Sequence, residues 1–205
     1  YEGVYLPDGS ILFNSTRCVQ TVPCWITPVS NLYAMDADGG NIHRLSVNHV
    51  HDNFPTVLED GRVVYTRWEY NDRGQLWLQG LFSMNPDGTL QREYYGTGSY
   101  FTPSFFDARP VPGHPRQVVG IATGHHGIAR SGRLLLIDPA FGHREAEGVV
   151  QEFPGWGKTV EPIVRDRLID GVWPQFTQPW PLSSDYHLVA MKPDAGSLWG
   201  IYLVD

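Results

Sequence analysis

Two groups of histidines have the residue types and spacing to bind a metal ion. His49 and His51 alternate along a stretch that is expected to be extended, which places both side chains on one face, and Asp52 follows directly. Imidazoles at this spacing can chelate a divalent cation such as zinc. His125 and His126 lie in a glycine-flanked turn, and we expect one of them to meet His51 or Asp52. The alternative is that these histidines are solvated and that Asp52 only caps a turn.

A second group combines charge with aromatic surface. Arg67, Trp68 and Glu69 are consecutive, and an indole face attracts cations and stacks on sugars. These three residues are therefore candidates for ligand binding. The alternative is that their charges form ion pairs between structural units.

The only two cysteines, Cys18 and Cys24, are separated by five residues. They could form a disulfide, provide thiolate ligands to a metal or to haem iron, or remain as two free thiols. A cysteine-poor chain that is exported favours the disulfide. A c-type haem needs Cys-x-x-Cys-His, which the sequence lacks, so no covalent haem can attach through that motif.

Other features exclude several classes of function. Neither the nucleophile elbow Gly-x-Ser-x-Gly, the phosphate-binding loop, the dinucleotide-binding glycine motif nor His-Glu-x-x-His occurs, so we assign no catalytic residue. The net charge is −7 and no run of Lys or Arg exists, which argues against nucleic acid as a partner. The longest purely aliphatic run, Leu134–Ile137, is far too short to span a membrane.

The elements that must position these residues are expected to be strands. The chain has 22 Gly and 16 Pro among 205 residues, which argues against a helix bundle. Apolar runs end in similar turns at a period of about 50 residues. In such turns Asp or Asn bonds its own backbone and Gly supplies a positive φ. The three turns begin at Asp36, Asn85 and Asp138, and a further extended stretch is expected after each, at residues 41–47, 90–95 and 149–153.

Each repeat reads as four short antiparallel strands, which is typical of a β-propeller blade. We therefore predict an all-β fold in one domain, with about four blades that belong to a larger ring. The alternative is a meander sandwich whose turns resemble one another by chance. The third repeat is long and is expected to contain a loop between about residues 140 and 170, and the fourth stops before its last strand. The predicted blades are approximately residues 1–50, 51–98, 99–168 and 169–205, with first strands starting near Val4, Phe54, Phe101 and Val172.

Several of these segments resemble known families. The phrase at residues 35–45, Met-Asp-Ala-Asp-Gly-Gly-Asn-Ile-His-Arg-Leu, resembles the blade repeat of TolB-type propellers. Segments 50–58, 62–70, 120–127 and 199–205 are similar to the middle domain of the hydrazine synthase alpha subunit. This resemblance implies a propeller within a large secreted bacterial protein. It also raises haem or zinc as cofactors, although nothing in the residues themselves identifies a cofactor.

Two functions are compatible with these observations. The first, which we favour, is a non-catalytic scaffold or binding module of a larger periplasmic or secreted bacterial protein, whose partners are other domains or subunits of that protein. The second is a redox enzyme subunit, similar to hydrazine synthase, whose haem centre lies at the interface with a domain outside this chain. The absence of Cys-x-x-Cys-His favours the first for this chain.

Overall fold

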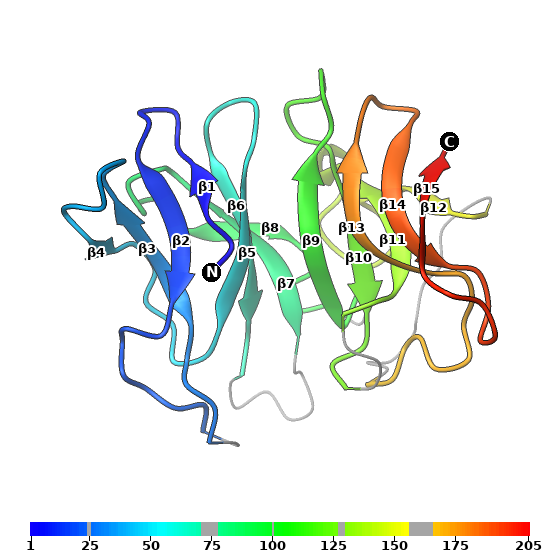
Figure 1. Cartoon of the computed structure of the whole chain (residues 1–205), viewed down its shortest axis with the longest axis horizontal. Helices are drawn as coiled ribbons and strands as arrows, with labels where there is room; N and C mark the ends of the chain where they lie inside the picture. The colour runs from blue at the N-terminus through cyan, green and yellow to red at the C-terminus, as the bar shows by residue number, and fades with distance from the viewer. Residues whose placement is uncertain (24–25, 71–77, 100, 127–129, 156–165) are drawn as a thin grey trace.

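The computed structural model describes residues 1–23, 26–70, 78–99, 101–126, 130–155 and 166–205. Its strands form four consecutive antiparallel groups, which we call the first, second, third and fourth sheets (Figure 1). The first sheet contains β1 (Val4–Tyr5), β2 (Ile11–Ser15), β3 (Asn31–Met35) and β4 (His43–Arg44). The second contains β5 (Asp52–Val57), β6 (Val63–Trp68), β7 (Gln79–Met84) and β8 (Arg92–Tyr95).

The third sheet contains β9 (Ser104–Pro110), β10 (Val118–Thr123), β11 (Arg133–Ile137) and β12 (Val149–Phe153). The fourth contains β13 (Gln175–Pro181), β14 (His187–Lys192) and β15 (Gly200–Val204). In every sheet, strands that follow one another in the chain pair with one another. The predicted all-β class with antiparallel sheets is therefore confirmed. The one helical element in the described residues is a 3-10 turn, η1 (Pro139–Phe141).

The four sheets stand next to one another in chain order (Figure 1). The first strands of neighbouring sheets are in contact, β5 with β9 and β9 with β13, and β5 also contacts β1 and β2. One parallel pairing, Gln79 with Ser104, joins the second and third sheets. In the described part of the chain the sheets form an open series and do not close into a ring.

Apolar side chains fill the spaces between neighbouring sheets. Leu12 and Leu32 of the first sheet pack with Tyr65 and Met84 of the second, and all four are buried. Equivalent clusters lie between the second and third sheets and between the third and fourth. Because burial of apolar surface is the dominant favourable term in folding, each sheet depends on its neighbours for stability.

The turns between strands confirm the pattern predicted from the sequence. Gly39 and Gly88 have φ values of 88° and 82°, and their N–H groups donate to the carbonyls of Asp36 and Asn85, both at 2.9 Å. A side chain strains this left-handed backbone, which explains the glycines. At Gly88 a Cβ atom would also approach the Leu45 carbonyl oxygen of the first sheet to 2.8 Å.

Some strand ends differ from the predictions. The stretch 41–47 was expected to be extended, but only His43 and Arg44 form β4. In the third repeat, β12 coincides with the predicted extended segment, whereas residues 156–165 of the expected loop lie outside the described residues. The strand expected to start near Phe54 starts at Asp52, so Pro55 lies within β5, at a bulge, which is one of the few places where a strand tolerates proline.

Candidate functional site

The first strands of the four sheets share an unusual backbone feature. Glu2, just before β1, and Phe54, Asp107 and Gln178, in β5, β9 and β13, have φ values of 54°, 53°, 52° and 50°. None of them is glycine, although L-residues in this region are strained by about 1–3 kcal/mol each. In β5, β9 and β13 the pairing register shifts at the same point, as in a β-bulge. Bulges re-aim side chains and are frequent near active sites.

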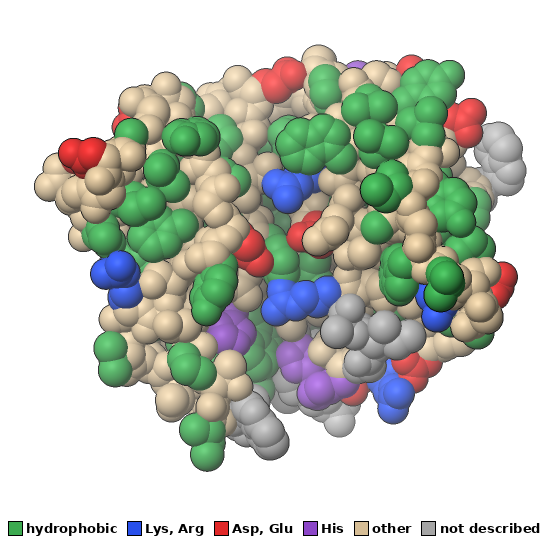
Figure 2. All heavy atoms as spheres, viewed as in Figure 1, with side chains coloured by type: hydrophobic (Ala, Val, Ile, Leu, Met, Phe, Trp, Pro, Cys, Tyr) green, Lys and Arg blue, Asp and Glu red, His purple; other side chains and the backbone are tan. Residues whose placement is uncertain are grey.

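The bulges bring charged side chains together in a cleft between these strands. A small cavity of about 90 Å³ is lined by Glu2, Phe54, Asp107 and Arg109. The Phe54 N–H donates to Glu2 Oε2 at 2.7 Å, so a carboxylate before the first sheet binds the bulge of the second. Figure 2 shows acidic, basic and histidine side chains gathered along the middle of this face.

Arg130 lies at the centre of this charged group. Its guanidinium carbon is 4.7 Å from the ring centroid of Phe54 and 5.5 Å from that of Phe106, which indicates cation–π stacking. Its charge also acts on Glu2 and Asp107, where it partly opposes the rise in pKa that burial causes. We call Glu2, Phe54, Asp107, Arg109 and Arg130 the inner-strand cleft.

Both carboxyls of the inner-strand cleft bind protons more readily than free ones. Burial raises the pKa of Asp107, and the charges of Arg109 and Arg130 oppose this only in part. Burial also raises the pKa of Glu2, against the Phe54 N–H and Arg130, and the charge of Asp107 adds to the rise. Glu2 is solvent-exposed whereas Asp107 is half-buried, so Asp107 is the stronger candidate for a functional carboxyl group. Carboxyl groups with shifted pKa values in a cleft are typical of functional sites.

His51 packs on Trp68 beside the inner-strand cleft. Its ring stacks on the indole at a centroid distance of 5.6 Å, and its Nδ1 accepts the Ser30 N–H at 3.1 Å. Burial lowers the pKa of His51, and the charge of Arg130 lowers it further. His51 is therefore a neutral imidazole at neutral pH, with its proton on Nε2.

The other predicted histidines occupy the same neighbourhood. The ring of His125 lies 5.2 Å from that of Trp68, and the ring of His126 lies 4.4 Å from that of His125. His126 Nδ1 is 2.8 Å from Asp166 Oδ1. The structure thus brings His51 and His125 to one tryptophan.

His49 was expected on an extended strand with His51, but it lies in a bend before β5. Its Nε2 contacts the Tyr70 carbonyl, a different partner from that of His51. Among the described residues, no three His, Cys, Asp or Glu side chains are grouped so as to hold a metal ion. The metal-ligand roles of these histidines and of Asp52 remain predictions.

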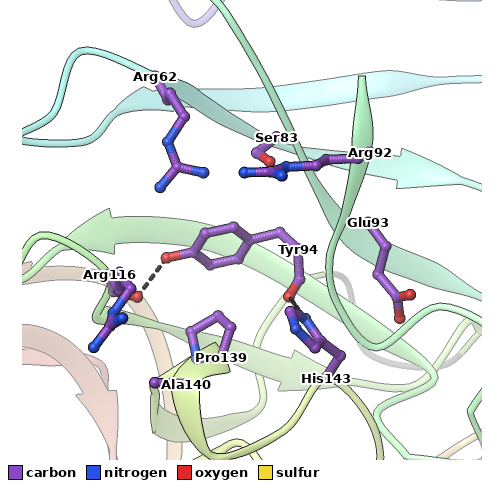
Figure 3. A pocket seen from close by; sticks show the side chains of 9 residues that line it. All are labelled: Arg62, Ser83, Arg92, Glu93, Tyr94, Arg116, Pro139, Ala140 and His143. Carbon is purple, nitrogen blue, oxygen red and sulfur yellow. Dashed lines mark hydrogen bonds between the residues drawn. The ribbon is translucent and has the colours of Figure 1, made fainter. Parts of the chain in front are cut away.

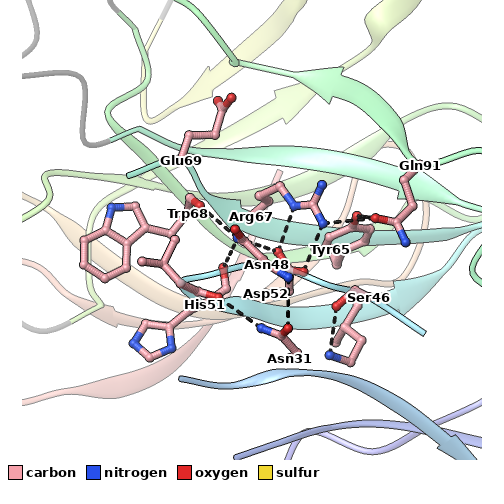
Figure 4. A network of polar contacts seen from close by, with 12 residues as sticks. Asn31, Ser46, Asn48, His51, Asp52, Tyr65, Arg67, Trp68, Glu69 and Gln91 are labelled. Atoms are coloured by element: carbon pink, nitrogen blue, oxygen red, sulfur yellow. Dashed lines mark hydrogen bonds and ion pairs between the residues drawn. The ribbon is translucent and has the colours of Figure 1, made fainter. Parts of the chain in front are cut away.

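Arg67 belongs to an internal network (Figure 4). Its Nε and one terminal nitrogen donate to the two carboxylate oxygens of Asp52 at 2.9 and 3.1 Å, and the Asp52 side chain is completely buried. The same terminal nitrogen also donates to Gln91 Oε1 at 3.0 Å. Burial opposes the charge on Arg67, but the hydrogen bond and charge of Asp52 outweigh it and raise the pKa of Arg67.

The network continues into the first sheet. Asn48 donates to Asp52 Oδ1 at 3.2 Å, and its own N–H donates to Asn31 Oδ1 at 3.0 Å. Gln91 donates to the Leu45 carbonyl at 3.0 Å. These contacts hold the first and second sheets together through polar groups that are mutually satisfied.

The ligand candidates Arg67, Trp68 and Glu69 therefore face the interior. The Arg67 side chain is 17% exposed and Trp68 is 8% exposed, while Glu69 accepts a hydrogen bond from Thr97. Binding a ligand through these three residues would require giving up internal contacts. The remaining prediction, a disulfide from Cys18 to Cys24, depends on Cys24, which lies outside the described residues. Cys18 Sγ contacts the Val29 carbonyl oxygen at 3.2 Å.

Sequence reasoning missed the inner-strand cleft. Its residues are far apart in the chain and meet only because the four first strands lie next to one another. One signal was available: Phe54 and Gln178 are each followed by proline, and Pro within a strand points to a bulge.

Comparison with known proteins shows the fold alone. The chain matches no family model, and no curated protein matches it. Among solved structures, Kuenenia stuttgartiensis Hydrazine Synthase is similar, with a TM-score of 0.68 and 18% sequence identity. The match covers 96% of this chain and 26% of the other, so this chain spans about a quarter of its neighbour. No helix in the described residues has the length and apolar character to cross a membrane. The expected relationship to hydrazine synthase is thus confirmed at the level of structure, while the likeness to TolB-type propellers stays a prediction.

Proposed function

We propose that this chain is a segment of a β-propeller that serves as a non-catalytic scaffold within a larger exported protein. The observation that carries the proposal is the series of four similar sheets, aligned over 96% of the chain with about a quarter of a hydrazine synthase chain. An open series leaves the outer sides of the first and fourth sheets without a neighbouring sheet. Further blades in the whole protein would cover them and complete the ring.

The inner-strand cleft is the surface we propose for docking another domain or subunit of that protein. It combines Arg130, stacked on two phenylalanines, with the raised-pKa carboxyls of Glu2 and Asp107. Such a mixture of aromatic surface and charge is typical of recognition. The net charge of −7 speaks against nucleic acid as the partner.

An experimental structure of the whole protein tests the scaffold directly. We expect a closed ring in which added blades pack against the first and fourth sheets, with another domain over Arg130. Sheets stacked face to face would contradict the propeller.

Function is tested on the same whole protein by its spectrum and metal content. We expect no haem absorption and no stoichiometric metal that depends on this segment. A Soret band lost on substitution of His51 or His125 would favour the alternative, a redox subunit whose haem lies against this segment.

Docking is tested by Arg130→Ala in the whole protein, with Arg17→Ala as the control. Arg17 is exposed and lies outside the inner-strand cleft. We expect Arg130→Ala alone to increase proteolytic cleavage between this segment and its neighbour. Equal cleavage in the two variants would place the docking surface elsewhere.

A further inference from the structure

A second cavity lies away from the inner-strand cleft. It has a volume of about 510 Å³ and lies where the second sheet meets the third. This volume is within the range of small-molecule sites. Its lining is unusually basic: Arg62, Ser83, Arg92, Glu93 and Tyr94 come from the second sheet, and Arg116, Pro139, Ala140 and His143 from the third.

Two guanidinium groups lie beside one aromatic ring in this cavity, and a third arginine lines its edge. Figure 3 shows Arg62 and Arg92 directed toward each other beside the Tyr94 ring, with Arg116 near the Tyr94 hydroxyl. Tyr94 is buried, and its hydroxyl donates to the backbone carbonyl of Arg116. His143 Nδ1 donates to the Tyr94 carbonyl at 2.8 Å, which leaves its Nε2 to act as an acceptor.

These arginines are only partly neutralised within the protein. Arg62 pairs with Asp60 at 2.8 Å, but in the described part of the chain neither Arg92 nor Arg116 has a side-chain hydrogen bond or ion pair. On a chain of net charge −7, three arginines around one cavity form a local positive field. Planar guanidinium groups bind phosphate and carboxylate oxygens through paired hydrogen bonds.

Glu93 adds a negatively charged hydrogen-bond acceptor to the same cavity. Its Oε1 is buried and has no hydrogen-bond partner among the described residues. Glu93 also lines the cavity, so its carboxylate can accept a hydrogen bond from a hydroxyl group of a bound ligand. In Figure 3 the Glu93 carboxylate lies to one side of the arginines, next to His143.

We propose that this cavity binds a small hydroxylated organic phosphate, such as a sugar phosphate. The phosphate oxygens bind Arg92, Arg116 and Arg62, and a ligand hydroxyl donates to Glu93.

Calorimetric titration of the full chain tests this site with glucose 6-phosphate, inorganic phosphate, glucose and citrate as probes. We expect saturable binding of glucose 6-phosphate that is tighter than that of phosphate, and no binding of glucose. Arg116→Gln and Arg92→Gln should each weaken glucose 6-phosphate binding about tenfold or more, because a charge-assisted hydrogen bond is lost. Arg17→Gln, which removes the same charge outside the cavity, should leave binding unchanged.

Glu93→Gln tests the contact with the ligand hydroxyl separately from the contacts with its phosphate. It should weaken glucose 6-phosphate binding but leave phosphate binding equal or tighter, because a negative charge leaves the cavity. Arg116 and Arg92 are exposed, so their variants are expected to unfold at the wild-type temperature. Equal affinities of wild type and Arg116→Gln, citrate binding as tight as glucose 6-phosphate, or no saturable binding would each overturn the proposal.

Discussion

The junction of the first and second sheets and that of the second and third use arginine in opposite ways. At the first junction, Arg67 binds both oxygens of a completely buried Asp52, and the surrounding amides are paired. At the second, Arg92 and Arg116 line an open cavity and bond to no carboxylate of the described residues. The first arrangement uses its charge inside the second sheet, where Asn48 links it to the first, whereas the second leaves its charge available to a ligand.

This difference predicts that removing the buried carboxylate of the first junction lowers the free energy of unfolding far more than removing an exposed one. Asp52→Ala leaves Arg67 buried without its partner, which should lower the free energy of unfolding by about 3–5 kcal/mol. Asp52→Asn, which keeps the shape and part of the hydrogen bonding, should cost less. Urea unfolding gives both values.

Asp170→Ala is the matched control, because it breaks an exposed ion pair with Arg167 of 2.5 Å. Such a pair contributes about 0–1 kcal/mol. If Asp52→Ala and Asp170→Ala had equal effects, the first junction would not depend on its buried charge pair.

The close approach of the first two sheets can be tested by adding a side chain where they meet. Gly39→Ala and Gly88→Ala both place a side chain at a positive φ, which costs about 1–2 kcal/mol. Only at Gly88 would the added Cβ also meet Leu45, at 2.8 Å from its carbonyl oxygen, whereas nothing lies within 4 Å at Gly39. Gly88→Ala should therefore lose about 1–3 kcal/mol more than Gly39→Ala in urea unfolding. Equal losses would mean that the junction relaxes without cost.

The sequence predicts the turns and strands well because their signals are local. Gly39 and Gly88 have the positive φ that their turns required, and Val149–Phe153 forms the expected strand. Contacts between repeats have no such local signal. Contacts between distant residues of one repeat also lack it: the sequence left open whether Arg67, Trp68 and Glu69 bind a ligand or form ion pairs, and Arg67 contacts Asp52 and Gln91 of its own repeat. Arg62, Arg92 and Arg116 are each unremarkable in the sequence, and only the meeting of two sheets makes them one site.

The first junction should also be sensitive to acid through His51. Because burial lowers the pKa of His51 below its ordinary value of 6.5, the unfolded chain binds this proton more readily than the folded one. Stability from this group is therefore complete above pH 6.5 and is lost as the pH falls below it. His51→Asn retains an acceptor for the Ser30 N–H but cannot titrate.

The free energy of unfolding of wild type and His51→Asn is measured from pH 8 to pH 5. Between pH 8 and pH 5, the free energy of unfolding should fall further in wild type than in His51→Asn, and the extra fall should occur below pH 6.5. Glu2 and Asp107, whose raised pKa values act in the opposite direction, titrate in both proteins and cancel in the comparison. Parallel curves would show that His51 is not held neutral by the fold.

The smallest expected effect concerns the one arginine of the second junction that has a partner. Asp60 pairs with Arg62 at the cavity while both side chains keep contact with solvent, at 37% and 25% exposure. Asp60→Asn retains an acceptor for the Arg62 N–H but removes the charge, so stability should change by less than about 1 kcal/mol. The freed guanidinium should tighten glucose 6-phosphate binding by about two- to fivefold, a gain that shrinks in 0.5 M salt because exposed charges are screened. Unchanged affinity at low salt would mean that Arg62 does not reach the ligand, and that Arg92 and Arg116 alone define the anion site.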